Sequence, residues 1–210
     1  MGTATSRVAA VGLAILATVA AGCGSSNGHA AASASAASTE TTTLARSASG
    51  AFAWFDPMPA PAGWNGASIP SGAVMYVPPG WQRERSDAGS ATAALRDSHQ
   101  HIVGYLNVTP RQGDENVATW ASFRVHHNAE EGDREVHSEG SAQRLRFRSG
   151  RGACVRDHYT TTTSNHYIEI ACLVAGPQRG SSVIVAAASP QAWPTLSPLL
   201  ERSISAFLAA

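Results

Sequence analysis

The stretch GACVRDHYTTTTSNHYIEIACLVA, residues 152–175, decides the fold. Its two strand-like runs, Gly152–Tyr159 and His166–Ala175, are separated by four threonines, a serine and an asparagine. Runs of this kind around a short polar segment predict an antiparallel β-hairpin. We place the turn at Thr163, which gives the hairpin a defined register.

Two of the three cysteines lie in this hairpin. The register sets Cys154 directly opposite Cys172, close enough for a cross-strand disulfide if the two residues form a non-hydrogen-bonded pair. A loop of this size adds about 3 kcal/mol of stability in the chain-entropy model. A catalytic redox pair usually has Cys-x-x-Cys spacing, which is absent here. We therefore predict a structural disulfide.

The same register brings two carboxylates together, Asp157 opposite Glu169. A pair of like charges is unfavourable unless an arginine from the neighbouring strand lies between them. The pair could share a proton or hold a cation, or it could form salt bridges with Arg144, Arg146 or Arg156. These are the best acid/base candidates in the chain, and no serine or cysteine has a recognisable nucleophile setting.

Working outward, the flanking segments predict further strands and two helices. The core-facing stripes are Val117, Trp120 and Phe123 in the first helix, and Leu196, Leu200, Ile204 and Phe207 in the last. Pro194 and Pro198 place the start of the last helix near Leu196. The expected strands are 73–77, 92–97, 102–109, 134–139, 143–148, 152–159, 166–175 and 182–188, and the expected helices are 115–129 and 196–208. This order predicts an α+β fold, an antiparallel sheet packed by two main helices.

Two short sequence segments resemble those of a known group of proteins. The turn Pro78-Pro79-Gly80-Trp81 follows the first strand, and the last helix contains LLERSISAF, residues 199–207. With the sheet between them, they resemble the small actinobacterial lipoproteins of the PsbP/Mog1-like group. The resemblance covers most of 73–208 and implies an α/β/α sandwich without an assigned catalytic residue.

The N-terminus has the pattern of an export signal. About fourteen apolar or small residues, 8–21, follow Arg7, too few for a spanning helix, which needs about 20. Residues 19–23, Val-Ala-Ala-Gly-Cys, resemble the lipobox of bacterial lipoproteins, with Ala20 where leucine is usual. We predict a signal peptide at 1–22 and lipidation at Cys23. The alternative is an ordinary secretory cleavage site near residues 32–34.

Composition divides the rest of the chain into a tether and a domain. Residues 23–50 are almost entirely serine, alanine, threonine and glycine, which predicts a flexible tether. The remaining 51–210 have the length of one α+β domain. The chain has no formal net charge at pH 7, which argues against nucleic-acid binding. We expect a lipid-anchored protein on the extracytoplasmic face of the cell membrane.

Candidate ligand-binding residues fall in three groups. Aromatic residues of the proline-rich lead-in 54–72 either pack on the domain or form a ligand platform, and arginines alternate with apolar residues in 143–148 as a basic strip or a solvated strand face. Histidines supply the third group, but no complete metal-binding motif is present. The named candidates are Trp54, Phe55, Trp64, Arg144 and Arg146 for a ligand, and His99, His101 and His127 for a metal.

These observations favour a non-catalytic binding or accessory module of the cell envelope. Its partner would be another envelope protein, a small molecule or a glycan, and no cofactor is expected. The competing hypothesis is a small envelope hydrolase or metal-dependent enzyme. A third possibility is a purely structural partner, which an exposed apolar patch would indicate.

Overall fold

The computed structural model describes residues 50–178 and 180–210, and its central feature is the predicted hairpin. Strands β7 (Gly150–Thr160) and β8 (His166–Ala175) pair antiparallel in the expected register. The predicted signal peptide, Cys23 and the tether lie outside the described residues. Within the described part of the chain, no helix is long and apolar enough to cross a membrane.

Seven strands form one antiparallel sheet around this hairpin, in the order β3-β4-β5-β9-β8-β7-β6. The strand expected at 182–188 occupies the middle of the sheet as β9. The other strands of the sheet are β3 (Gln82–Glu84), β4 (Ala91–Arg96), β5 (Ile102–Pro110), β6 (Arg134–Phe147) and β9 (Ser181–Ala188).

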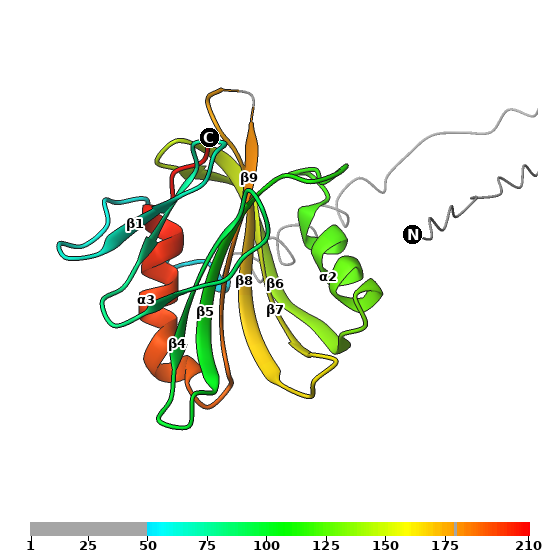
Figure 1. The fold of residues 1–210 in the computed structure, drawn as a ribbon. Helices are drawn as coiled ribbons and strands as arrows, with labels where there is room; N and C mark the ends of the chain where they lie inside the picture. The colour runs from blue at the N-terminus through cyan, green and yellow to red at the C-terminus, as the bar shows by residue number, and fades with distance from the viewer. Residues whose placement is uncertain (1–49, 179) are drawn as a thin grey trace, which may run out of the picture. The chain divides into compact units, whose positions relative to one another are not determined.

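Two helices cover opposite faces of the sheet (Figure 1). Helix α3 (Trp193–Ala206) packs on one face and helix α2 (Trp120–Glu130) on the other. A small two-stranded sheet of β1 (Asn65–Ser68) and β2 (Val74–Val77) joins the α3 side. The α+β fold predicted from the order of the elements is therefore correct, and its layers are those of the α/β/α sandwich that the resemblance implied.

The α3 face holds the larger apolar core. Leu196, Leu200, Ile204 and Phe207 are buried, as their predicted stripe requires. They pack with buried side chains of the sheet and with β1 and β2. Gly104 of β5 keeps this contact close, because a Cβ atom there would lie 2.8 Å from Leu196 Cδ1.

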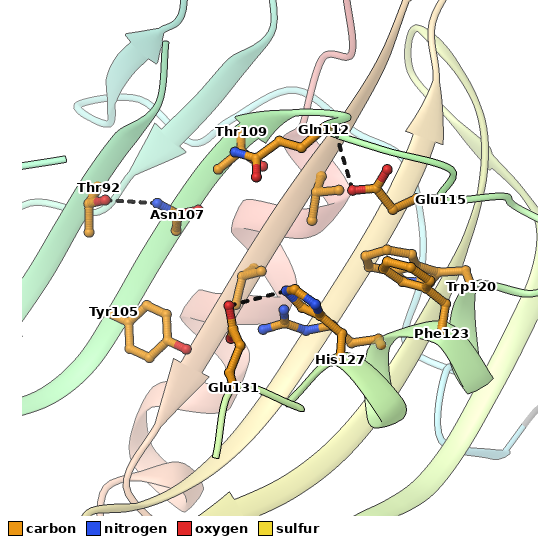
Figure 2. A pocket seen from close by; sticks show the side chains of 13 residues that line it. Thr92, Tyr105, Asn107, Thr109, Gln112, Glu115, Trp120, Phe123, His127 and Glu131 are labelled. Carbon is orange, nitrogen blue, oxygen red and sulfur yellow. Dashed lines mark hydrogen bonds and ion pairs between the residues drawn. The ribbon is translucent and has the colours of Figure 1, made fainter. Parts of the chain in front are cut away.

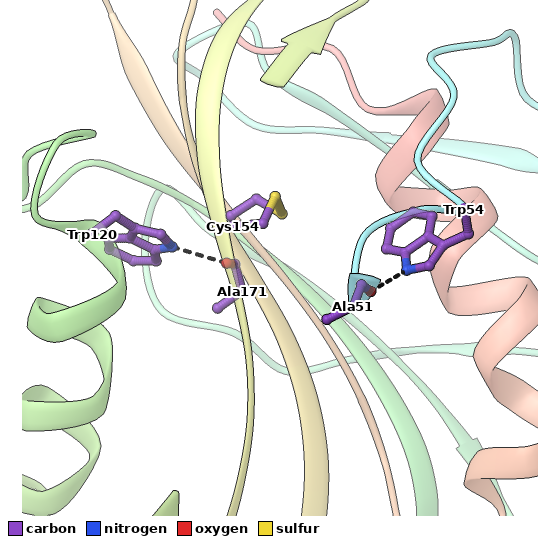
Figure 3. Close-up of a disulfide and its surroundings, with 6 residues drawn as sticks. Ala51, Trp54, Trp120, Cys154 and Ala171 are labelled. Carbon is purple, nitrogen blue, oxygen red and sulfur yellow. Dashed lines mark hydrogen bonds between the residues drawn. A yellow bond between two sulfur atoms is a disulfide. The ribbon is translucent and has the colours of Figure 1, made fainter. Parts of the chain in front are cut away.

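The disulfide belongs to the α3 face. Cys154 and Cys172 are bonded, fully buried, and have Cα atoms 4.1 Å apart, which fits the predicted cross-strand pair. Figure 3 shows Trp54 on the disulfide's side of the sheet and Trp120 on the opposite side. The indole of Trp120 donates a hydrogen bond to the carbonyl of Ala171, 2.9 Å away. Trp120 thus packs on the other face, whereas the disulfide joins β7 and β8 within the larger core.

Two predictions about the strands are wrong. The lead-in 54–72 contains strand β1 because its four prolines lie outside residues 65–68. The two strands predicted at 134–139 and 143–148 are one strand, β6. Its pairing with β7 shifts register at several points, two of them between residues 138 and 145. Bulges of this kind are common on edge strands, where they hinder pairing with other chains.

The helix starts also differ from the predictions. Helix α2 begins at Trp120 rather than near residue 115, because residues 112–119 form turns held by the side chains of Glu115 and Asn116. Helix α3 begins at Trp193, so Pro194 occupies its first turn and Pro198 lies inside it. Proline is well suited to a first turn, where its missing N–H has no helical partner.

Candidate functional site

A pocket of about 320 Å³ opens on the α2 face, between α2 and strands β4, β5 and β9 (Figure 2). Its volume is at the lower end of the range for small-molecule sites. The sheet brings the lining together because alternate residues of β5 point to this face. Leu106 and Val108 between them are buried in the α3-side core. The pocket therefore lies over a polar strip of β4 and β5.

One wall of the pocket is aromatic and comes from α2. Phe123 stacks on Trp120 with ring centroids 5.9 Å apart, and His127 stacks on Phe123 at 5.6 Å. The three residues are spaced three and four apart, so they share one side of the helix. Glu131 pairs with His127 across 3.2 Å. Figure 2 shows these side chains rising together from the helix.

The opposite wall is made of uncharged polar side chains. Thr92 comes from β4, and Asn107 and Thr109 come from β5, followed by Gln112. Asn107 donates a hydrogen bond from Nδ2 to Thr92 Oγ1 at 2.8 Å. These groups can both donate and accept hydrogen bonds. The pocket thus places a hydrogen-bonding surface opposite an aromatic one.

Beside the pocket lies a buried ion pair that the sequence did not predict. Arg124 of α2 donates two hydrogen bonds to the fully buried carboxylate of Glu169, at 2.7 and 3.0 Å. The arginine comes from a helix, not from the neighbouring strand or from Arg144, Arg146 or Arg156. Burial opposes the charge of Arg124, but Glu169 outweighs it and raises the pKa of the guanidinium.

Two tyrosines complete this network. The hydroxyls of Tyr105 and Tyr159 lie 2.7 Å apart, and each lies within 3.2 Å of Glu169 Oε2. Burial, followed by the negative charge of Glu169, raises the pKa of both phenols. The tyrosines are therefore neutral hydrogen-bond donors. With Arg124 and two phenols bound to it, Glu169 has a structural role in holding α2 against the sheet.

Asp157 faces Glu169 on the neighbouring strand, as predicted, but it takes no part in the ion pair. It is completely buried, and neither carboxyl oxygen has a hydrogen-bond partner in the described part of the protein. Burial, with the nearby Glu169 charge, raises the pKa of Asp157 to about 8. At neutral pH this group is protonated, which removes the like-charge repulsion expected from the register.

The residues proposed as a ligand surface lie away from this pocket. Trp54 and Phe55 are half-buried against the α3-side core, where Phe55 contacts Phe147 at a ring distance of 4.8 Å. Trp64 is half-buried just before β1, and Arg144 and Arg146 are exposed on the edge strand β6. The fold does not bring these five residues together with the pocket lining.

The metal candidates are separated. His99 and His101 are near neighbours in the turn between β4 and β5, with ring centroids 6.1 Å apart, while His127 belongs to the aromatic wall. Another hollow, of about 460 Å³, is lined by a different group of histidines, His137, His158 and His166. Within residues 50–178 and 180–210, no three histidine, cysteine or acidic side chains are placed to hold a metal ion.

Sequence reasoning missed most of the polar wall, although a signal was present. In residues 105–109, Tyr105, Asn107 and Thr109 alternate with two buried apolar residues, which is the pattern of a strand with one polar face. The role of Arg124 had no such signal. Its partner lies 45 positions away, and only the packing of α2 on β8 brings the two together.

Comparisons with known proteins show the fold class. No family model and no curated protein sequence matches this chain. Its seven-stranded antiparallel sheet between two helices is a PsbP/Mog1-like fold. The solution structure of PsbP from the cyanobacterium Synechocystis sp. PCC 6803 matches with a TM-score of 0.51 and 15% identity, over 71% of this chain and 94% of that protein.

Two other solved structures are less similar. The Ran-binding protein Mog1p of Saccharomyces cerevisiae has a TM-score of 0.46 and 9% identity, over 68% of this chain and 87% of Mog1p. LpqN, a protein involved in cell envelope biogenesis of Mycobacterium tuberculosis, has a TM-score of 0.38 and 15% identity, over 73% of this chain and 82% of LpqN. At these identities the comparisons describe the fold alone.

Proposed function

We propose that this chain is a lipid-tethered, non-catalytic module of the cell envelope that binds an uncharged sugar in the pocket between α2 and β4–β5. The observation that carries the proposal is the pairing of an aromatic wall with a wall of hydroxyl and amide groups. A sugar ring has the matching surfaces, apolar C–H faces and a rim of hydroxyls. Such a ligand uses both walls at once.

The charges around the pocket support an uncharged ligand. Arg124 is paired with Glu169, and His127 is paired with Glu131. The carboxylate of Glu115 accepts hydrogen bonds from the backbone N–H groups of Gln112 and Gly113. Each charged group of the lining therefore has a partner within the protein. An anionic or cationic ligand would have to compete for groups that are already engaged.

The carboxyl groups support a binding role over hydrolysis. Glycoside hydrolysis usually needs one carboxylic acid with a raised pKa and one ionised carboxylate facing the same bond. Burial opposes the ionisation of Glu115, but its backbone hydrogen bonds outweigh that effect and lower the pKa. The carboxyl with the strongly raised pKa is Asp157, which does not line the pocket. The acid with the strongly raised pKa thus lies outside the pocket lining.

The envelope location rests on the N-terminal sequence. The lipobox-like Val-Ala-Ala-Gly-Cys at 19–23 and the expected tether up to residue 50 support a position of the domain at the membrane surface, with reach toward glycans. Replacement Cys23→Ala tests the anchor. The variant should move from the membrane fraction to the soluble extracytoplasmic fraction, and continued membrane retention would contradict lipid anchoring.

A binding experiment tests the site itself. The full chain is applied to an array of neutral monosaccharides and linear oligosaccharides, beside Phe123→Ala and the matched control Val125→Ala on the same helix. Phe123→Ala should weaken retention of the bound sugar about tenfold or more, a loss of at least about 1.4 kcal/mol. Val125→Ala should bind as the parent does. Near-UV circular dichroism checks that both variants keep the fold.

Three results would contradict this function. The first is an array on which the parent chain retains no sugar. A second is retention that Phe123→Ala leaves unchanged, which would place binding elsewhere. The third is cleavage of the retained sugar during a long incubation, detected by mass spectrometry, which would show an enzyme.

A further inference from the structure

The α2-side pocket continues beyond its polar wall. Four of its lining residues also line a second cavity of about 470 Å³ on the far side of that wall. The second cavity is bounded on one side by the loop between β3 and β4. The shared residues are Thr92, Asn107, Thr109 and Gln112, and the loop residues are Arg85, Ser86, Asp87 and Ser90. The two cavities therefore adjoin along this shared strip of β4 and β5, and together we call them the groove.

The shared strip is chemically uniform along the groove. It carries two hydroxyl and two amide side chains and no charge. The one hydrogen bond between its members, from Asn107 to Thr92, leaves the second amide proton and the carbonyl oxygen of Asn107 for a ligand. A ligand that passes from one cavity to the other would meet hydrogen-bonding groups throughout.

The two ends of the groove differ. The α2 end is aromatic, whereas the loop end is polar and lined by exposed side chains, Arg85 and Asp87 among them. A single sugar ring gains from the aromatic end but leaves the loop end unused. A chain of sugars fills both, because only one of its rings has to pack against the aromatic wall.

From this continuity we infer that the groove binds a linear oligosaccharide rather than a single sugar, with one ring against Phe123 and the following rings along the shared strip toward Ser90. This inference rests on the proposed sugar-binding function and adds the ligand's length and direction. It assigns a binding role to the β3–β4 loop, which the α2-side pocket alone does not require.

The test measures how affinity depends on ligand length, in the parent chain and in a variant whose new side chain fills only the loop end. Ser90 is half-buried and lines the second cavity but not the first. Replacement Ser90→Trp should block that cavity. The matched control is Ser71→Trp, an equally large change at an exposed turn that lines neither cavity. Parent and variants, all as the full chain, are measured against one sugar as a monomer and as linear oligomers of two to six units.

The parent chain should bind the longer oligomers about tenfold or more tightly than the monomer, with a plateau once the groove is filled. Ser90→Trp should remove this gain and leave monomer binding unchanged, and Ser71→Trp should behave as the parent. Equal affinity for monomer and oligomers would overturn this inference and leave the sugar-binding function standing. A length dependence that Ser90→Trp does not alter would likewise overturn this inference and leave the sugar-binding function standing. Failure to bind any sugar of the array would overturn both.

Discussion

The two faces of the central sheet are built on different principles. The α3 face is covered by a 14-residue helix with six buried residues, Leu200 and Ile204 among them. The α2 face is covered by an 11-residue helix whose buried residues are Trp120 and Asn128. Around α2, a smaller apolar cluster is joined by charged and polar groups, the Arg124–Glu169 pair and the phenols bound to it. One face thus accounts for most of the apolar burial, while the other keeps a hollow polar surface.

The largest expected effect is a cavity on the α3 face. Replacement Leu200→Ala removes a fully buried side chain and should lower the free energy of unfolding by about 3–5 kcal/mol. The neighbouring Leu199 is 36% exposed in the same helix, so Leu199→Ala should change stability by less than about 0.5 kcal/mol. Urea denaturation measures both. Similar losses for the two variants would show that α3 does not pack through Leu200.

The α2 face should respond to loss of charge rather than loss of volume. Arg124→Met leaves the buried Glu169 carboxylate without its cation and should cost about 3–4 kcal/mol. Adding Glu169→Gln to this variant removes the unpaired charge while keeping an acceptor for Tyr105 and Tyr159. The double variant should therefore recover most of the loss. If it is no more stable than Arg124→Met, the ion pair does not explain the effect.

Removal of the disulfide is expected to cost somewhat less. The double replacement Cys154→Ala and Cys172→Ala opens a link across 18 positions, worth about 3 kcal/mol in the chain-entropy model. The sugar site on the opposite face should keep its affinity. Denaturation and array binding measure the two quantities. A stability loss below about 1 kcal/mol, or loss of sugar binding in a folded variant, would argue against a purely structural disulfide.

The smallest effect per measured step, one pH unit, is a pH dependence of the free energy of unfolding that Asp157 causes. Its folded-state pKa, about 8, lies above the ordinary value of about 3.9, so its contribution to stability is full below about pH 4. That contribution falls as pH rises toward about 8, by up to about 1.4 kcal/mol per pH unit. Asp157→Asn should flatten the decline, and Asp87→Asn in the exposed loop should not. Parallel pH profiles for the parent and Asp157→Asn would contradict this assignment.

The sequence predicted the α3 face much better than the α2 face. The hairpin register, the disulfide and the stripe of α3 follow from local patterns, because period-two and helical periodicities record which side chains face a core. The partner of Glu169 could not be found in this way. Arg124 reaches it only after α2 has packed across the sheet, and no residue near either partner indicates the contact.

The position of the pocket was only partly predictable. The alternation of Tyr105, Asn107 and Thr109 with buried residues indicated a polar strip on β5. The second wall depended on where α2 begins, and the turns that delay its start until Trp120 were not predicted. The large aromatic residues of the lead-in were candidates for a ligand platform, but Trp54 and Phe55 pack against the α3-side core.

Native-state hydrogen exchange of the full chain tests the contrast between the two faces most directly. The amides of α2 should exchange through local openings, with a free energy several kcal/mol below that of global unfolding, because so little of this helix is buried. The amides of α3, β8 and β9 should exchange only at the global value. If α2 and α3 exchange with the same free energy of opening, the two faces contribute equally to stability, and the division between them is wrong.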